Sequence, residues 1–236
     1  MGGRDQIIEN HAELASSFLS DSELSGDSLP PTLVINLQRR DDRWHDFRHR
    51  AEAAELGNYQ RWMACDAHYL GRSSSLDSLY DGWNYDRYKA VMACGISHAS
   101  LWSYIAQSPH DAVLVLEDDV VFNSDFALNW QQQWQQWQQD PLWSVGYLGG
   151  SWDNRLSWQE SIKQLTLVAC SYVLRRRGAM ELLATIRYKG FHTAADRFIT
   201  EVLHQRRRSA VFAPAPITTH PGYADSDIQD PHPSWL

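Results

Sequence analysis

The sequence predicts an α/β, Rossmann-like fold, in which helices flank a central sheet, and two patterns support this. Short apolar runs rich in Val, Leu and Ile, such as 32–37 and 112–116, are typical of strands that are buried on both faces. Between them lie segments whose apolar residues recur every three or four positions, as in amphipathic helices. With 43% apolar and 21% charged residues among 236, the composition is that of an ordinary globular protein. We therefore expect a single domain built around one sheet.

Residues 1–31 are polar and are predicted to lie outside this domain as an N-terminal extension. Within it, 7–19 is expected to form one short amphipathic helix and 25–31, which contains Ser, Gly and Pro, a linker. The domain itself is predicted to span 32–228, followed by a C-terminal tail over 229–236.

The domain is predicted to begin with a strand over 32–37, a polar turn and an amphipathic helix. This order resembles the opening unit of nucleotide-binding α/β proteins, although the turn has no glycine-rich phosphate loop. It offers Asn36, Arg39 and Arg43 instead, and arginine binds phosphate groups through paired hydrogen bonds. The alternative is that both arginines are surface residues near the start of a helix.

A second strand is expected over 59–64, and 66–89 is expected to be a long loop above the active site. The next helix, over 91–107, contains Ser97 and His98. Two interpretations of His98 remain open. It continues the apolar face of the helix, as a core histidine with a hydrogen-bond partner would, or it lies with Ser97 near a helix start that faces a bound nucleotide.

The stretch 112–122 joins a buried apolar strand to three consecutive acids, Glu117, Asp118 and Asp119. Ligands bind at the carboxyl ends of strands in α/β sheets, and neighbouring carboxylates are costly to bury without a compensating charge. Because side chains alternate along an extended chain, we expect Glu117 and Asp119 to point one way and Asp118 the other. Two carboxylates on one side suit Mg²⁺ or Mn²⁺. The alternative is an acidic turn that binds nothing.

The second half of the chain is predicted to continue the alternation of helices and strands. A Gln-rich helix over 126–139 carries three tryptophans at helical spacing, which we expect to pack in the core. The remaining strands are expected at 144–148, 165–174 and 210–213, with helices over 178–187 and after residue 193.

Asp196 stands at the start of the last of these helices. Thr193 and Asp196 have the spacing of a capping box, which would give Asp196 a purely structural role. The polar tail that follows contains His220, Asp225 and Asp227, and such a tail can fold back over a metal site.

Charge, cysteine content and hydropathy exclude several classes of protein. A net charge of −8 argues against nucleic acid as the main partner. Three widely spaced cysteines form no disulfide framework, which fits a reducing, cytoplasmic location. The sequence shows no signal peptide and no apolar run long enough to span a membrane. The arginine runs 175–177 and 206–208 are expected on solvated helix faces, and peripheral contact with anionic lipids of the inner membrane is the alternative.

Four stretches in order then resemble glycosyltransferase family 25, which includes lipopolysaccharide-type β-galactosyltransferases and collagen galactosyltransferases. They are Val-Ile-Asn-Leu-Gln-Arg-Arg-Asp-Asp-Arg (34–43), Cys-Gly-Ile-Ser-His-Ala-Ser-Leu-Trp (94–102), Val-Leu-Glu-Asp-Asp-Val (115–120) and Ser-Tyr-Val-Leu-Arg-Arg-Arg-Gly-Ala (171–179). The later Ser-Asp-Ile at 226–228 is similar to the closing motif of that family.

This resemblance implies a GT-A-like fold with a mixed, mostly parallel sheet, and an enzyme that transfers a hexose with inversion. The donor would be UDP-galactose or UDP-glucose, the cofactor Mn²⁺ or Mg²⁺, and the acceptor a glycan, lipopolysaccharide or protein. Asp196 would be the general base, with Asp153 and Asp225 as alternatives. The remaining roles fall into two groups: metal binding by Glu117, Asp119 and His220, and donor binding by Asn36, Arg39, Arg43, Ser97, His98 and Asp118.

Two other functions are compatible with the same residues. A module of this fold could bind a sugar nucleotide or glycan without catalysis, which donor binding with neither transfer nor hydrolysis would reveal. Acids at a strand end also serve metal-dependent phosphohydrolases, which would release phosphate from simple phosphoesters.

Overall fold

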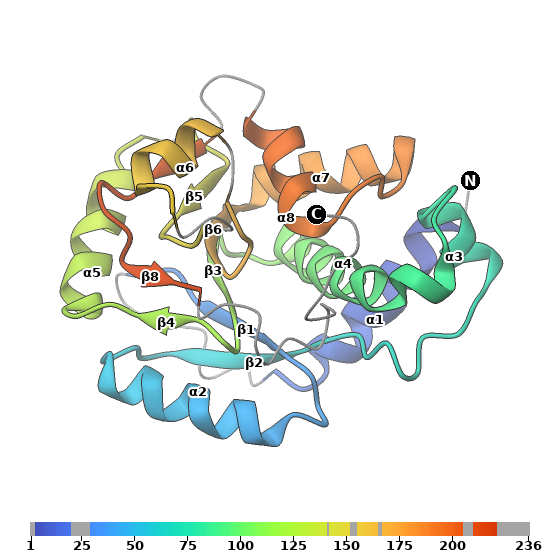
Figure 1. Cartoon of the computed structure of the whole chain (residues 1–236), viewed down its shortest axis with the longest axis horizontal. Helices are drawn as coiled ribbons and strands as arrows, with labels where there is room; N and C mark the ends of the chain where they lie inside the picture. The colour runs from blue at the N-terminus through green and yellow to red at the C-terminus, as the bar shows by residue number, and fades with distance from the viewer. Residues whose placement is uncertain are drawn as a thin grey trace.

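The computed structural model describes residues 3–19, 29–140, 142–151, 155–164, 167–204 and 210–220. Its main sheet has six strands in the order β2-β1-β3-β6-β5-β7 (Figure 1). Five of them run in one direction, and β6 runs against both of its neighbours. This is the mixed, mostly parallel sheet that the sequence predicted. The strands are β1 (Thr32–Asn36), β2 (Tyr59–Met63), β3 (Ala112–Glu117), β5 (Val145–Tyr147), β6 (Ser171–Arg175) and β7 (Ala210–Phe212), and a small second sheet pairs β4 (Val121–Phe122) with β8 (Thr218–Thr219).

Helices surround the sheet, and none of those in the described ranges is long and apolar enough to cross a membrane. They are α1 (Arg4–Ser16), α2 (Asp41–Ala53), α3 (Ser74–Leu79), α4 (Tyr85–Gln107), α5 (Phe126–Trp137), α6 (Trp158–Gln164), α7 (Arg176–Lys189) and α8 (Ala195–Ile199), which continues in a π-helical turn, Thr200–His204.

The sheet is covered on both faces because alternate side chains of its strands point in opposite directions. Leu33 and Ile35 of β1 join the core beneath α1, α4 and α7, whereas Val34 between them joins the core beneath α2 and α5. In Figure 1, α2 and α5 lie at the lower left of the strands, and α1, α4 and α7 at the right. The buried apolar runs in the sequence therefore correspond to strands with helices on both faces, as expected.

The tryptophan stripe of α5 is part of the core, as predicted. Trp130, Trp134 and Trp137 are all buried, and Trp143 packs against the rings of the last two. Gly146 of β5 lies directly beneath this cluster, where a Cβ atom would come within 2.5 Å of the Trp137 ring. Only glycine fits at this position, because any side chain would clash with the Trp137 ring.

The position of the N-terminal helix differs from the prediction, which placed residues 1–31 outside the core. Helix α1 packs along α4 and contacts α3, with Ile8, Ala12 and Ala15 buried. Arg4 donates hydrogen bonds to the carbonyl oxygens of Ser78 at 2.7 Å and of Tyr188 at 3.0 Å. The segment looked like an extension because its contact face is made of few, mostly small side chains. The domain boundaries at 31 and 228 stay predictions.

The segment predicted as a long loop, 66–89, contains α3 and the first turn of α4. Both helices begin at a polar cap: the Ser73 side chain accepts a hydrogen bond from the Leu76 amide, and that of Asn84 accepts one from the Arg87 amide. Helix α3 has only two turns, which is too short for its buried leucines to establish a helical period in the sequence.

Candidate active site

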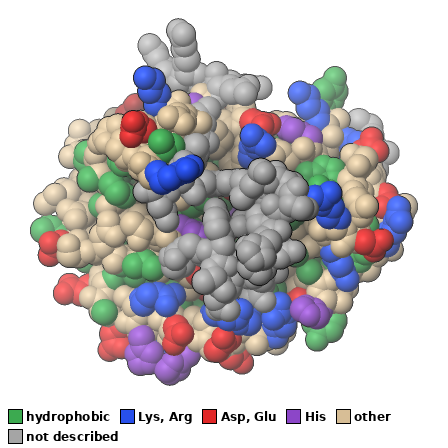
Figure 2. Space-filling view, viewed as in Figure 1, with side chains coloured by type: hydrophobic (Ala, Val, Ile, Leu, Met, Phe, Trp, Pro, Cys, Tyr) green, Lys and Arg blue, Asp and Glu red, His purple; other side chains and the backbone are tan. Residues whose placement is uncertain are grey.

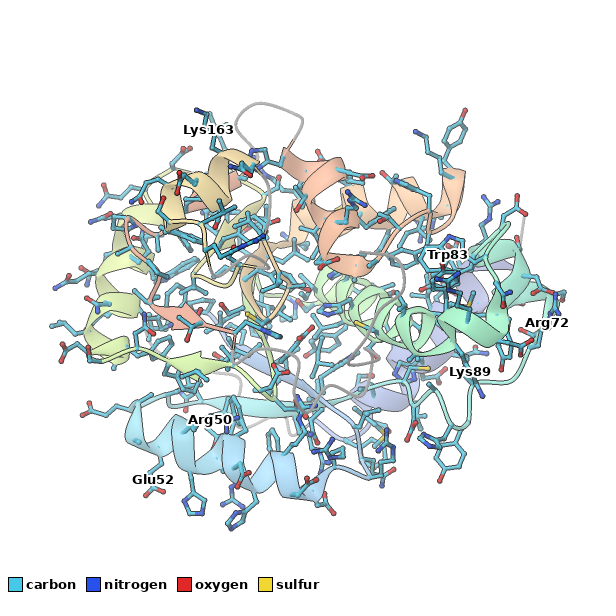
Figure 3. All side chains as sticks on the ribbon, in the orientation of Figure 1. Arg50, Glu52, Arg72, Trp83, Lys89 and Lys163 are labelled. Atoms are coloured by element: carbon cyan, nitrogen blue, oxygen red, sulfur yellow. The ribbon has the colours of Figure 1, made fainter. Side chains whose placement is uncertain are left out.

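The turn that follows β3 carries the three predicted acids. Strand β3 ends at Glu117, and the Val120 amide bonds back to the Glu117 carbonyl oxygen at 3.2 Å. Arg50, which is labelled on α2 in Figure 3, fixes the outer side of the turn. Its guanidinium donates to the carbonyl oxygens of Asp118 at 2.6 Å and Val120 at 3.1 Å. The turn is therefore held by α2 as well as by the sheet.

The carboxylates of Asp118 and Asp119 share one cation. Arg43 Nη2 pairs with Asp118 Oδ1 and lies 2.9 Å from Asp119 Oδ2. Asn36, at the end of the neighbouring β1, donates from Nδ2 to Asp118 Oδ2. The expectation that Asp118 points away from Asp119 was wrong, because the extended chain ends at Glu117 and a turn brings both aspartates to the same guanidinium.

The cost of burying the charged carboxylates of Asp118 and Asp119 is greater than the stabilisation that Arg43 gives them. Burial raises the pKa of Asp118 to about 7, although Arg43 and Asn36 act in the opposite direction. Burial and the nearby Glu117 also raise the pKa of Asp119. The Oδ1 atom of Asp119 is buried and has no hydrogen-bond partner in the described part of the chain. An unpaired buried carboxylate oxygen beside two further carboxylates is a donor set that fits a hard divalent cation.

His98 is held at both ring nitrogens. Its Nε2 lies 3.0 Å from Glu117 Oε1, and its Nδ1 lies 2.9 Å from the Tyr172 hydroxyl, which also accepts from Trp102 Nε1 at 3.0 Å. When Tyr172 donates its one proton to Nδ1, the proton of the neutral imidazole is on Nε2 and points at Glu117. Burial is the largest single influence on the pKa of Glu117 and raises it, but the His98 hydrogen bond and the charges of His98, His220 and Arg43 together outweigh burial, so the pKa is lowered. The core interpretation of His98 is confirmed, since the side chain is fully buried and has hydrogen-bond partners. The position near a helix start was wrong, because α4 begins at Tyr85 and His98 lies in its middle.

Ser97 and Arg39 are engaged with other residues. The Ser97 hydroxyl donates to the Ala93 carbonyl oxygen and accepts from the Cys65 amide, both at 2.8 Å. Arg39 Nε pairs with Asp66 Oδ2 at 2.9 Å. Ser97 therefore links α4 to the end of β2, whereas Arg39 projects from the turn between β1 and α2.

The predicted base and the third metal ligand come from the C-terminal part of the chain. Asp196 lies in the first turn of α8, and its Oδ1 accepts from the Arg197 amide at 2.6 Å. The capping box is absent, because Ala194 is the N-cap and no side chain caps this helix. His220 follows β8, and its charge acts to lower the pKa of both Glu117 and Asp119, so it lies near the acidic turn.

One cavity of about 550 Å³ brings all of the predicted site residues together. Its walls come from the end of β1, the loop after β2, α4, the acidic turn, the start of α8 and His220. Figure 2 shows Lys and Arg side chains around the centre of the face seen in Figure 1. The sequence-predicted residues that line the cavity are Asn36, Arg39, Arg43, Ser97, His98, Glu117, Asp118, Asp119, Asp196 and His220.

Comparison with known protein families matches residues 29–159 to the family described as glycosyltransferase family 25 (LPS biosynthesis protein). The match covers more than half of the 236 residues and includes β1, α4 and the acidic turn. The chain belongs to glycosyltransferase family 25. This family 25 protein is therefore a glycosyltransferase enzyme, and its fold is a mixed, mostly parallel sheet flanked by helices.

Several solved glycosyltransferase structures are similar to this family 25 enzyme at a low level. The apo form of GlyE from Streptococcus pneumoniae TIGR4 has a TM-score of 0.42 at 10% identity, over 80% of this chain and 54% of its own. This chain thus spans about half of GlyE. The galactosyltransferase LgtC, solved with donor and acceptor sugar analogues, has a TM-score of 0.40 at 14% identity, over 77% of this chain and 72% of its own. Mouse xyloside xylosyltransferase 1, in its apo form, has a TM-score of 0.36 at 10% identity, over 95% of this chain and 94% of its own. No curated protein matches the sequence.

Sequence reasoning missed four residues that shape the site of this family 25 enzyme: Arg50, Asp66, Cys94 and Tyr172. Tyr172 is 74 positions from His98 in the sequence, and no local pattern links the two. Cys94 had a visible signal, since it precedes His98 by one helical turn. The alternative bases Asp153 and Asp225, the 226–228 motif, the 206–208 arginines and the tail all lie outside the described residues.

Proposed function

We propose that this protein transfers a hexose, galactose or glucose, from a UDP-sugar to a hydroxyl group of a glycan, lipopolysaccharide or protein, with a divalent metal and with inversion. The observation that carries this proposal is the acidic turn of a family 25 chain, which faces a cavity with Arg43 beside it and Asp196 in the wall. A cavity of about 550 Å³ is within the size range of small-molecule sites.

Glu117, Asp119 and His220 would hold Mn²⁺ or Mg²⁺. Among the described residues Asp119 Oδ1 has no hydrogen-bond partner, and the pKa of the same side chain is raised. Both observations support this role, because a cation would relieve both. When bound, the metal supplies charge stabilisation for the departing nucleoside diphosphate. His98 would orient Glu117 through their 3.0 Å hydrogen bond.

The donor diphosphate would lie against the residues that follow β1. Arg39 and Arg43 carry positive charge into the cavity, and guanidinium groups match phosphate oxygens in geometry. Asn36 and Asp118, which are hydrogen-bonded to each other, would set the floor of this subsite. Ser97 would contribute to donor binding indirectly, because its hydroxyl accepts a hydrogen bond from the Cys65 amide and so positions the loop after β2.

Asp196 would act as the general base. It takes the proton from the acceptor hydroxyl as this oxygen attacks the anomeric carbon from the face opposite the departing diphosphate. Asp196 lines the same cavity as the acidic turn and comes from a separate element, α8, which supports a role on the acceptor side.

Transfer from UDP-galactose and UDP-glucose tests this proposal, measured with and without Mn²⁺ alongside the melting temperature. A bound donor must raise the melting temperature, and we expect this shift to depend on metal. Asp119→Asn should reduce transfer by at least about 10²-fold, the scale seen when one group that stabilises transition-state charge is lost. Asp46→Asn is the matched control, because Asp46 is exposed on α2 and does not line the cavity. Full transfer by Asp119→Asn would refute the metal role.

Asp196→Asn separates binding from chemistry. We expect this variant to keep the donor-dependent shift in melting temperature and to lose transfer by about 10²–10⁴-fold, the usual contribution of a general base. Unchanged transfer would rule out Asp196 as the base.

A further inference from the structure

A second group of metal-binding side chains lies beside the acidic turn. Cys94 and His98 are four residues apart on α4 and so share one helix face, and Glu117 approaches them from the end of β3. The Cys94 sulfur, a ring nitrogen of His98 and a carboxylate oxygen of Glu117 all lie within 4.8 Å of one another. In a tetrahedral zinc site, bond lengths of about 2.0–2.3 Å place neighbouring ligand atoms about 3.3–3.6 Å apart. Small side-chain shifts would bring these three atoms to that spacing.

The surroundings of His98 suit a metal ligand. Histidines that bind zinc are usually held at the other ring nitrogen by a hydrogen bond, which fixes the orientation of the ring. The Tyr172 hydroxyl lies 2.9 Å from Nδ1 and can accept this bond, and Trp102 Nε1 in turn donates to the Tyr172 hydroxyl. Nε2 is therefore directed at Glu117 and the cavity, and no rotation of the buried ring is needed for coordination.

We propose that Cys94, His98 and Glu117 bind Zn²⁺ as a site of its own, distinct from the Mn²⁺ or Mg²⁺ site on the acidic turn. All three residues line the cavity, so a fourth position is left for water, as in zinc sites with three protein ligands. The site needs no sugar donor. It uses Glu117, which is also assigned to the donor metal, so Zn²⁺ is expected to compete with Mn²⁺ for the enzyme.

The chemistry of the ligands selects the metal. Thiolate and imidazole bind Zn²⁺ much better than Mn²⁺ or Mg²⁺, whereas the carboxylates of the acidic turn discriminate less and are ligands that suit Mg²⁺ and Mn²⁺. Burial keeps the pKa of the free Cys94 thiol well above its ordinary value, and the nearby Glu117 adds to this. Zinc coordination replaces the thiol proton, which is released to solvent. The Nε2 proton of neutral His98 moves to Nδ1, where the Tyr172 hydroxyl accepts the hydrogen bond.

Cobalt(II) is the probe that tests this site, because it replaces zinc and gives a sulfur-to-cobalt charge-transfer band only when a thiolate is bound. Metal-free protein titrated with Co²⁺ should develop this band with a stoichiometry of one, and Zn²⁺ should abolish it. Cys94→Ser should remove the band. Cys65→Ser is the matched control, since Cys65 lines the same cavity but is not one of the three clustered ligands. No band in the wild type, or an unchanged band in Cys94→Ser, would overturn the proposal.

The wild-type protein provides a second test that does not depend on how a variant folds. Cysteine alkylation is followed residue by residue by mass spectrometry, with and without Zn²⁺. We expect Zn²⁺ to slow the modification of Cys94 in a saturable way and to leave that of Cys65 unchanged. Equal rates for Cys94 with and without Zn²⁺ would contradict the site.

Asp119→Asn separates this proposal from the donor-metal proposal. The variant should keep the cobalt band, because Asp119 is not a ligand of the zinc site, while it loses Mn²⁺-dependent transfer. Loss of the band in this variant would show that thiolate-bound cobalt also needs Asp119, and would refute a zinc site separate from the acidic turn. Retained transfer would refute the donor-metal role and leave the zinc site standing.

Discussion

His98 and Glu117 share a 3.0 Å hydrogen bond that joins the middle of α4 to the end of β3. The histidine is fully buried, while the glutamate carboxylate reaches the cavity with 24% of its side chain exposed. A buried partner that is itself held by Tyr172 limits the motion of the carboxylate. The position of Glu117 therefore depends on packing deep in the core.

Tyr172→Phe tests this dependence. Loss of one hydroxyl group leaves the Trp102 Nε1–H and the His98 Nδ1 without their shared partner, so the free energy of unfolding should fall by about 1–3 kcal/mol. Transfer should fall as well, because Glu117 loses its fixed partner. Denaturant unfolding and initial rates measure the two effects. Tyr188→Phe, at an 82% exposed position of α7, is the control and should change neither.

Arg50→Met tests the support that α2 gives to the acidic turn. The substitution removes the hydrogen bonds to the carbonyl oxygens of Asp118 and Val120 and keeps much of the aliphatic side chain. We expect a loss of about 1–3 kcal/mol in the free energy of unfolding and a weaker affinity for Mn²⁺, measured by titration calorimetry. Arg48→Met, at an exposed position of the same helix, should leave both unchanged. Wild-type affinity in Arg50→Met would show that the sheet alone holds the turn.

His11 should make stability depend on pH. Its Nε2 lies 3.0 Å from the Met63 carbonyl oxygen, and burial lowers its pKa below the ordinary 6.5. The unfolded chain then binds a proton more readily than the folded one, so the free energy of unfolding falls as pH drops below about 6.5. His11→Gln, which can still donate to Met63, should flatten this part of the profile of thermal stability against pH. His45→Gln, at an exposed position of α2, should leave the profile as in the wild type.

Gly146→Ala tests the close packing of β5 against α5. The new methyl group would lie within 2.5 Å of the Trp137 ring, which other tryptophans hold in place, so we expect a loss of about 1–3 kcal/mol or more in denaturant unfolding. Gly57→Ala is the control, because nothing lies within 4 Å of its Cβ and its φ is not positive. A Gly146→Ala protein as stable as wild type would mean that α5 moves freely on the sheet.

The sequence predicted the elements whose patterns are long and regular. Strands β1 and β3 and the tryptophan face of α5 were found because continuous burial or a helical period extends over many residues. Helix α3 was missed because it has only two turns, and α1 was placed outside the core because its buried residues are few and mostly small. Local patterns also could not show that the chain turns after Glu117 and brings Asp118 and Asp119 to one arginine.

The candidate site was predicted as a set of residues, and the structure gathers that set around one cavity. The family motifs selected most of these residues, since the individual patterns left His98 and Asp196 open, and the roles of the residues stay predictions. The partners that position the set were not predictable. Tyr172, Arg50 and Asp66 contact site residues that are 74, 68 and 27 positions away, and only the completed fold brings them together.

The reversed strand β6 affects how the enzyme is made on the ribosome. It lies between β3 and β5, its residue Tyr172 holds His98, and the Cys170 carbonyl just before it accepts the Glu117 amide at 2.9 Å. A nascent chain that has emerged only through β3 can pair β1, β2 and β3, yet it lacks Tyr172, which holds His98, and the Cys170 carbonyl that accepts the Glu117 amide. Pairing between β3 and β6 closes a long chain segment, which is slow compared with local contacts. The cavity is thus completed late in synthesis, and a prematurely terminated chain would present its carboxylate cluster without the support of β6.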